Sequence, residues 1–190
     1  MARIGQYVYS NKSLALVATM AALGNILALI SMYVGSFHPQ VALDFSHLAT
    51  AVVAIYLGPV MGMITGGLVG MAPFYYFGVL GWLGPFLGFV GFFIGKSLTG
   101  LFIGLFTKKF RPFLAVILGF VPECIWLYVV LRFLSRVFLP LHIASAFTDY
   151  MVLGILGKAW FEIVVIAALM DLIKKRRIVD AILAPTGTVE

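Results

Sequence analysis

The sequence predicts an all-α integral membrane protein with six transmembrane helices, and its composition and its apolar runs carry this prediction. Of the 190 residues, 63% are hydrophobic and only 11% are charged, whereas soluble domains carry about 25% charged residues. The mean hydropathy is +1.10. Because a span needs roughly 20 residues, six spans with short loops nearly use up the chain. We therefore expect a single transmembrane domain over 1–190 and no separate soluble domain.

The individual helices are expected where apolar runs lie between loops, turn residues and charges. These runs extend over about 13–33, 46–57, 59–77, 85–106, 112–133 and 146–173. The second and third runs are separated by Gly58-Pro59, a strong helix-breaking pair. Basic residues at 108–111 separate the fourth from the fifth.

The basic residues predict the orientation of the bundle. With six spans, the N-terminus, the 108–111 loop and the tail after 173 lie on one side, and they hold most of the lysines and arginines near the spans. The opposite loops hold only Arg132 and Arg136. Because basic loops remain in the cytoplasm, we expect both termini there. Membrane anchoring and contact with anionic lipid then explain the net charge of +6 without a nucleic-acid partner.

The stretch from Leu43 to Gly70 is predicted to be the helical hairpin around which the other spans pack. Asp44 or Ser46 is placed to cap the first helix by accepting hydrogen bonds from free backbone N–H groups. Glycines then recur at every fourth position, at 58, 62, 66 and 70. Residues at this spacing share one face of a helix, and small residues there let another backbone approach closely.

The same stretch resembles the substrate-binding (S) components of energy-coupling factor (ECF) transporters, which are small six-helix vitamin-uptake proteins of bacteria and archaea. The resemblance is carried by Leu43-Asp44-Phe45-Ser46, a short helix, Leu57-Gly58-Pro59-Val60 and the glycine-rich helix. The riboflavin-type branch is the most similar. The resemblance implies a multi-pass protein of the cell membrane that binds a vitamin or related ring-bearing micronutrient, with a riboflavin-like compound as the first guess. It implies a transmembrane scaffold subunit and two ABC-type ATPases as partners, and no cofactor.

Ala18 and Ala22 form a small-xxx-small pair on the first span. In lipid, such a face lets helices pack by close contact. The resemblance implies that this pair docks onto the scaffold subunit. Packing within the chain's own bundle is the alternative interpretation.

Four ionisable residues are expected near the middle of their spans: Lys96, Glu123, Lys158 and Glu162. A charge at this depth is costly, so each should face the bundle interior or a wet cavity. Lys158 and Glu162 are four residues apart and share a helix face, and Trp126 lies one turn from Glu123 on a similar face. An interior cavity with paired charges and an aromatic wall suits a small polar, ring-bearing ligand.

The resemblance places the ligand between the first outer loop and spans four to six. The predicted substrate-binding residues are therefore Asp44, Lys96, Glu123, Trp126, Lys158 and Glu162. We expect Lys158 and Glu123 to contact the ligand or one another. Because the four midspan charges sum to zero, a closed structural ion-pair network is the alternative. Riboflavin-type members carry Asn-x-x-Lys on the last helix, whereas this chain has Lys158-Ala159-Trp160-Phe161 followed by Glu162, which admits a zwitterionic or differently charged ligand.

No catalytic or metal site is expected. The segment 91–97 has three residues between its glycines where a P-loop needs four, and the three histidines lack the spacing of a zinc site. Two other functions remain as alternatives to vitamin binding. One is a stand-alone carrier or channel for small solutes, and the less favoured one is an intramembrane enzyme that acts on a lipid-linked substrate.

Overall fold

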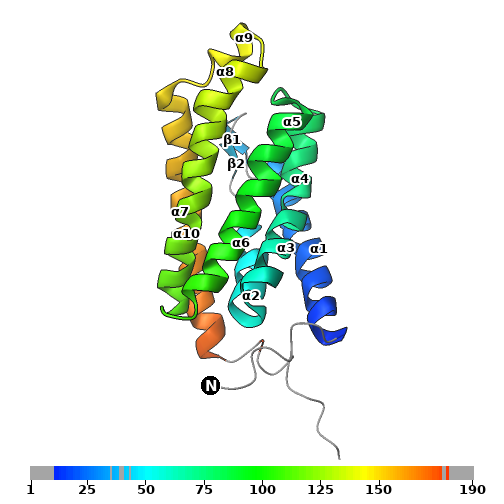
Figure 1. Cartoon of the computed structure of the whole chain (residues 1–190), viewed down its shortest axis with the longest axis vertical. Helices are drawn as coiled ribbons and strands as arrows, with labels where there is room; N and C mark the ends of the chain where they lie inside the picture. Colours follow the sequence, from blue (N-terminus) through cyan, green and yellow to red (C-terminus); the bar gives the residue numbers. More distant parts are fainter. Residues whose placement is uncertain (1–10, 35, 39–40, 43, 177–178, 180–190) are drawn as a thin grey trace, which may run out of the picture.

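The computed structural model describes residues 11–34, 36–38, 41–42, 44–176 and 179, and its helices form an elongated bundle (Figure 1). The elements of the first half are α1 (Asn11–Val34), β1 (Ser36–His38), β2 (Val41–Ala42), α2 (His47–Leu57), α3 (Pro59–Val69), α4 (Met71–Pro73) and the π-helical segment η1 (Phe74–Val79). Those of the second half are α5 (Gly84–Gly88), the π-helical η2 (Phe89–Ile94), α6 (Gly95–Phe106), α7 (Pro112–Val129), the π-helical η3 (Val130–Leu134), α8 (Ser135–Phe138), α9 (Leu141–Ala144) and α10 (Asp149–Lys175).

Five continuous helical stretches are long and apolar enough to cross a membrane, which confirms a multi-pass, all-helical membrane protein. They extend over Asn11–Tyr33, Pro59–Val79, Gly84–Phe106, Pro112–Phe138 and Asp149–Lys175. These agree with five of the six predicted spans, apart from shifts of a few residues at their ends. The last predicted span begins later than expected because Thr148 caps α10, its side chain accepting a hydrogen bond from the Met151 N–H.

The predicted span over 46–57 is a shorter element than expected. The helix α2 has 11 residues, which corresponds to about 16 Å at 1.5 Å per residue and is too short for a hydrocarbon core of about 30 Å. Figure 1 shows α2 in the lower part of the bundle and the small antiparallel β1–β2 ladder in the upper part. Asp44 and Ser46 lie between these two elements, inside the bundle rather than at its end.

The predicted glycine face is confirmed as the contact between α3 and α6. A Cβ atom on Gly62 would lie 2.5 Å from the Gly100 carbonyl oxygen, and one on Gly66 would overlap the Lys96 carbonyl group. Gly58 has a different role, because it has nothing near its Cβ position and adopts a φ of +92° at the turn between α2 and α3. The close approach presses the backbone of α6 against α3 at Lys96.

Asn25 holds α1 against the break between α3 and α4. Its side-chain amide donates hydrogen bonds to the carbonyls of Ala21 (2.8 Å) and Leu68 (2.9 Å), and its carbonyl oxygen accepts one from the Ala72 N–H (2.8 Å). In an uninterrupted α-helix the Ala72 N–H would bond to the Leu68 carbonyl. The Asn25 side chain therefore replaces that bond and satisfies both backbone groups.

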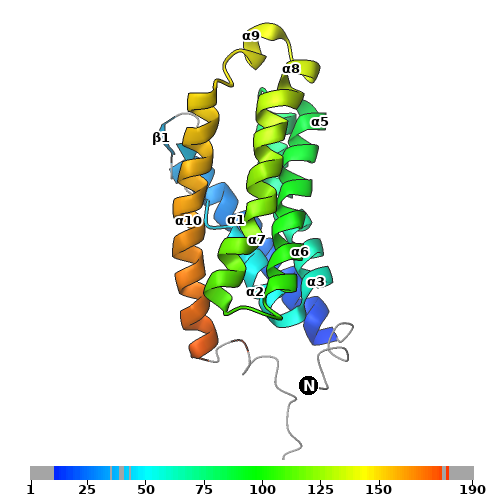
Figure 2. The same cartoon turned by 60° about the vertical axis from the view of Figure 1, so that its left-hand side comes forward.

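The apolar core forms two clusters. One is centred on α2, α7 and α10 and includes Val53, Phe120 and Ile163. The other includes Leu83 and Leu131 and lies where α5, η3 and the start of α10 meet. Figure 2 shows α8 and α9 connecting α7 to α10 at that end of the bundle. Side chains of both clusters line the cavity described next.

Candidate substrate-binding site

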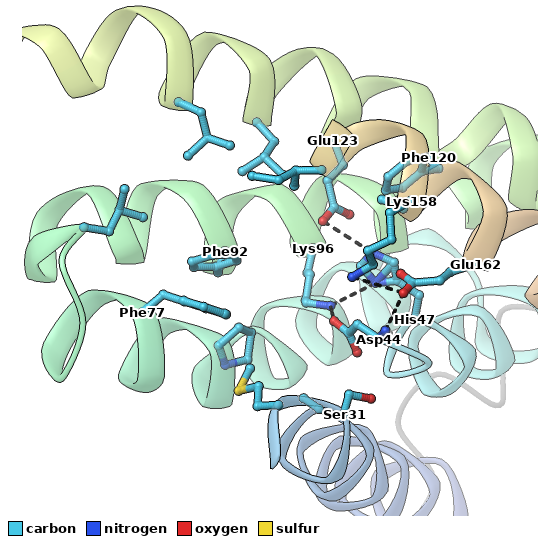
Figure 3. A pocket seen from close by; sticks show the side chains of 18 of the residues that line it. Ser31, Asp44, His47, Phe77, Phe92, Lys96, Phe120, Glu123, Lys158 and Glu162 are labelled. Atoms are coloured by element: carbon cyan, nitrogen blue, oxygen red, sulfur yellow. Dashed lines mark hydrogen bonds and ion pairs between the residues drawn. The ribbon is translucent and has the colours of Figure 1, made fainter. Parts of the chain in front are cut away.

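A cavity of about 130 Å³ lies inside the bundle, with a charged end and an apolar end (Figure 3). Six titratable side chains line the charged end: Asp44, His47, Lys96, Glu123, Lys158 and Glu162. They come from the segment before α2, the first residue of α2, and the helices α6, α7 and α10. Segments up to 118 residues apart therefore meet at this site.

Lys96 is the centre of the charged end. Its ammonium group donates to Asp44 Oδ2 at 2.9 Å and to Ser46 Oγ at 2.7 Å, and it lies 3.0 Å from His47 Nδ1. The lysine side chain is only 3% exposed. Because an ammonium group has three N–H donors, these contacts use its full capacity. A buried lysine charge is tolerated in this position since it is both paired and hydrogen-bonded.

The contact with Lys96 also explains why Ser46, one of the two predicted capping residues, does not cap α2. Ser46 precedes α2, but its side chain accepts no hydrogen bond from the helix N-terminus, because its hydroxyl oxygen faces Lys96. The other oxygen of the Asp44 carboxylate accepts from the Ser46 N–H at 2.8 Å. The capping prediction is therefore wrong for Ser46, whereas Asp44 accepts from a backbone N–H at the start of this helical segment as predicted.

A second ion pair ties α10 to the segment before α2. Lys158 Nζ lies 3.1 Å from Glu162 Oε1, which confirms that the two residues share a helix face. The same Glu162 oxygen accepts a hydrogen bond from the Asp44 N–H at 2.6 Å. The carboxylate of Glu162 therefore links α10 to the residue that pairs with Lys96.

Glu123 occupies the α7 side of the cavity between two neutral groups. The hydroxyl of Thr99 donates to Glu123 Oε2, and His47 Nε2 lies 3.4 Å from Glu123 Oε1. Gly95 of α6 lies beside this side chain, since a Cβ atom there would be in ordinary van der Waals contact with Glu123 Cγ at 3.4 Å. The expected partner Lys158 is instead paired with Glu162, while Glu123 contacts Thr99 and His47.

The opposite end of the cavity is aromatic. Phe77 and Phe92 stack with their ring centroids 5.4 Å apart, and Trp82 lies beside Phe77 at 6.4 Å. Phe77 belongs to η1 and Phe92 to η2, while Leu131 of η3 also lines the cavity. π-Helical segments frequently occur at functional sites. Here each of the three supplies one residue of the apolar lining.

Five of the six predicted substrate-binding residues line this cavity, and Trp126 does not. Its indole N–H donates to the Val90 carbonyl at 2.8 Å, and it packs among residues of the second apolar cluster. Trp126 lies one turn after Glu123 on α7, but its side chain is directed toward the Val90 carbonyl of η2 instead of into the cavity. Trp82, from the turn after η1, is the tryptophan that lines the cavity.

Sequence reasoning missed His47, Thr99 and Ser46 as members of the cluster. His47 was considered only as an isolated histidine, although it follows the Asp44–Ser46 motif directly. Thr99 lies one turn after Lys96 on α6, and this spacing is the signal that places both on one face. Asp149, on the same helix as Lys158 and Glu162, is paired with Arg132 and lies outside the cavity lining.

The two alanines of the predicted docking pair lie elsewhere. Ala18 and Ala22 are exposed on α1, and neither lines the cavity. The pair therefore faces away from the chain's own bundle, which removes the alternative of packing inside it.

Comparisons with protein-family models, with curated proteins and with solved structures found no match to this chain. The functional argument consequently rests on the site itself.

Proposed function

We propose that this protein is the substrate-binding subunit of an ECF-type vitamin transporter. The observation that carries the proposal is the interior cavity in which five ionisable side chains predicted for the site meet an aromatic wall. Charged residues at this depth of a membrane protein mark substrate or ion pathways. The elements that supply them, the segment before α2 and the helices α6, α7 and α10, are those that the sequence resemblance implies for the vitamin site.

The volume of the cavity limits the size of the ligand that it can hold. A cavity of about 150 Å³ in another protein accommodates one benzene ring, and this one measures about 130 Å³. A ligand with one ring fits the site as it stands, with its polar groups toward Lys96 and its ring against Phe92. A riboflavin-like ligand, with three fused rings, requires the walls to move apart.

The proposal includes six membrane crossings with both termini in the cytoplasm of a bacterial or archaeal cell. Figure 1 shows the start of α1, the turn between α6 and α7 and the end of α10 at one end of the bundle, which supports an even number of crossings. Five crossings are the long helices, and the sixth is α2 with the segment before it. Non-helical backbone is tolerated at membrane depth where protein surrounds it.

In this proposal the chain binds substrate and catalyses no reaction. A transmembrane scaffold subunit and two ABC-type ATPases drive uptake, and the exposed pair Ala18 and Ala22 on α1 is the docking surface for the scaffold. The basic end of α10, at Lys174 and Lys175, contacts anionic lipid in this proposal.

The test is native mass spectrometry of the purified protein, followed by release and identification of the small molecule that remains bound. We expect one ring-bearing compound per chain. Lys158→Met should lose it, because Lys158 lines the cavity, whereas Lys175→Met should retain it, because this exposed lysine lies at the far end of α10. Equal retention in both variants would contradict the site. Substrate movement into vesicles without ATP or partners would favour the stand-alone carrier, and turnover in detergent would favour the enzyme.

A further inference from the structure

We infer that the cavity selects a ligand that carries one positive charge. The inference deepens the proposed function and rests on it, because it names the class of compound that the binding subunit takes. It follows from the hydrogen-bond geometry around Lys96 and from the charges that line the cavity.

The protonation of His47 is set by its neighbour. The ammonium group of Lys96 lies 3.0 Å from His47 Nδ1, and an ammonium group only donates hydrogen bonds. Nδ1 must therefore accept, so it carries a lone pair and the ring is neutral. The ring proton is then on Nε2, which lies 3.4 Å from Glu123 Oε1. A protonated imidazole would instead direct an N–H group at the lysine.

The cavity lining consequently holds an unbalanced negative charge. Three carboxylates line it, Asp44, Glu123 and Glu162, and two ammonium groups line it, Lys96 and Lys158. Lys96 is paired with Asp44, and Lys158 is paired with Glu162. Three negative charges against two positive charges leave one negative charge in excess.

Glu123 carries this excess. The Thr99 hydroxyl donates a hydrogen bond to one of its oxygens and the His47 ring lies 3.4 Å from the other, and neither group supplies a counter-charge. A buried charge without a counter-charge is costly. A cation bound in the cavity supplies the counter-charge, so the site should bind a cation more tightly than a neutral compound of the same shape.

The remaining lining indicates an organic cation with a flat ring. Phe77, Trp82 and Phe92 present aromatic rings to the cavity, and the faces of such rings attract cations. The volume of the cavity accommodates a ligand with one ring. The ligand class is therefore a planar single-ring compound with a protonated amine, an amidinium group or a positively charged ring nitrogen.

The inference is tested with three probes of nearly identical shape. At neutral pH, benzamidine carries a charge of +1, benzamide is neutral and benzoate carries −1. Each is titrated into the purified full-length protein in detergent after the co-purified compound has been removed, and the change in tryptophan fluorescence is followed, since Trp82 lines the cavity. We expect benzamidine to bind at least tenfold more tightly than benzamide, and benzoate to bind more weakly than both.

Variants assign the preference to Glu123. Glu123→Gln should reduce the ratio between benzamidine and benzamide to less than threefold, whereas Glu123→Asp should keep a preference for the cation. Asp171→Asn is the matched control, because Asp171 is an exposed acid on α10 outside the cavity lining, and it should leave the ratio unchanged. If Glu123→Gln cannot be purified, the ratio for the unmodified protein decides the question by itself.

Several results would overturn the inference. Benzamide binding as tightly as benzamidine would show that Glu123 holds a proton, and tighter binding of benzoate would show that the excess charge has the opposite sign. Failure of all three probes to bind would exclude the single-ring class. A neutral or anionic co-purified compound would overturn the inference while leaving the proposed function standing. A preference for benzamidine in a protein that retains no small molecule would support the inference and contradict the proposed function.

Discussion

Replacement of Asp44 by asparagine tests how strongly the buried ion pair holds the site together. The change preserves the shape of the side chain but removes the negative charge 2.9 Å from Lys96. Breaking a buried pair by removing one partner costs about 3–5 kcal/mol. We expect about 3 kcal/mol, the lower end of that range, because the Asp44 side chain is 25% exposed and because Ser46 and His47 still accept from Lys96.

The assay is thermal unfolding in detergent, followed by tryptophan fluorescence. For a chain of this length, each kcal/mol lowers the melting temperature by about 2–4 °C, so Asp44→Asn should lower it by about 6–12 °C. Trp160 is a suitable reporter because its ring packs edge-on against Phe120, which lines the cavity, at a centroid distance of 5.2 Å. The matched control is Asp149→Asn, which breaks the pair with Arg132. The Asp149 side chain is 58% exposed, so the free energy of unfolding should fall by less than about 1 kcal/mol.

The double variant Asp44→Asn with Lys96→Met separates electrostatics from shape. It leaves no unpaired charge in the interior, so it should be more stable than Asp44→Asn alone. The reasoning would be refuted if the double variant were no more stable than the single one, or if Asp149→Asn lowered the melting temperature as much as Asp44→Asn.

Three further predictions concern the fold, the docking surface and the topology. Gly66→Ala should destabilise the protein by about 1–3 kcal/mol, because its Cβ would overlap the backbone of α6. Gly91→Ala should change the stability little, since the nearest atom to its Cβ would be 3.5 Å away. Similar melting temperatures for the two variants would contradict the close contact between α3 and α6. Ala22→Trp should abolish co-purification with a scaffold subunit and leave the bound ligand in place. Loss of the ligand with the scaffold subunit still bound would show that Ala22 supports the ligand site instead of the docking surface. Cysteines introduced at Thr107 and Ser145 should react with a membrane-impermeant reagent from opposite sides of a vesicle, and labelling of both from one side would exclude the six-crossing topology.

The long helices and the glycine contact were predictable because both depend on patterns that are local in sequence. Apolar runs of sufficient length identify spans in any membrane protein. Glycines at every fourth position define a face of α3 whatever lies opposite, and Gly62 and Gly66 do contact α6 closely. Gly58 follows the same spacing but serves the turn, because its neighbour Pro59 starts a new helix. Spacing identified the face but not the role of each glycine on it.

The candidate site was predicted in part. Midspan charges identify Lys96 and Glu123 because a charge in an apolar span must face the interior. The partners of each charge were not predictable, since His47 and Lys96 are 49 residues apart and meet only through the packing of α2 against α6. Trp126 was assigned to the cavity from its proximity to Glu123 in sequence, but the direction of its side chain depends on where η2 lies.

The sequence by itself determined that this chain is a multi-pass helical membrane protein and that its midspan charges face the interior of the bundle. The reason is that the cost of placing a charge in lipid depends on residue type and depth. The tertiary structure decided which charges pair, which aromatic rings line the same cavity and that α2 begins inside the bundle at His47. These features depend on the approach of separate helices to within hydrogen-bonding distance, and that approach is set by side-chain packing between segments distant in sequence.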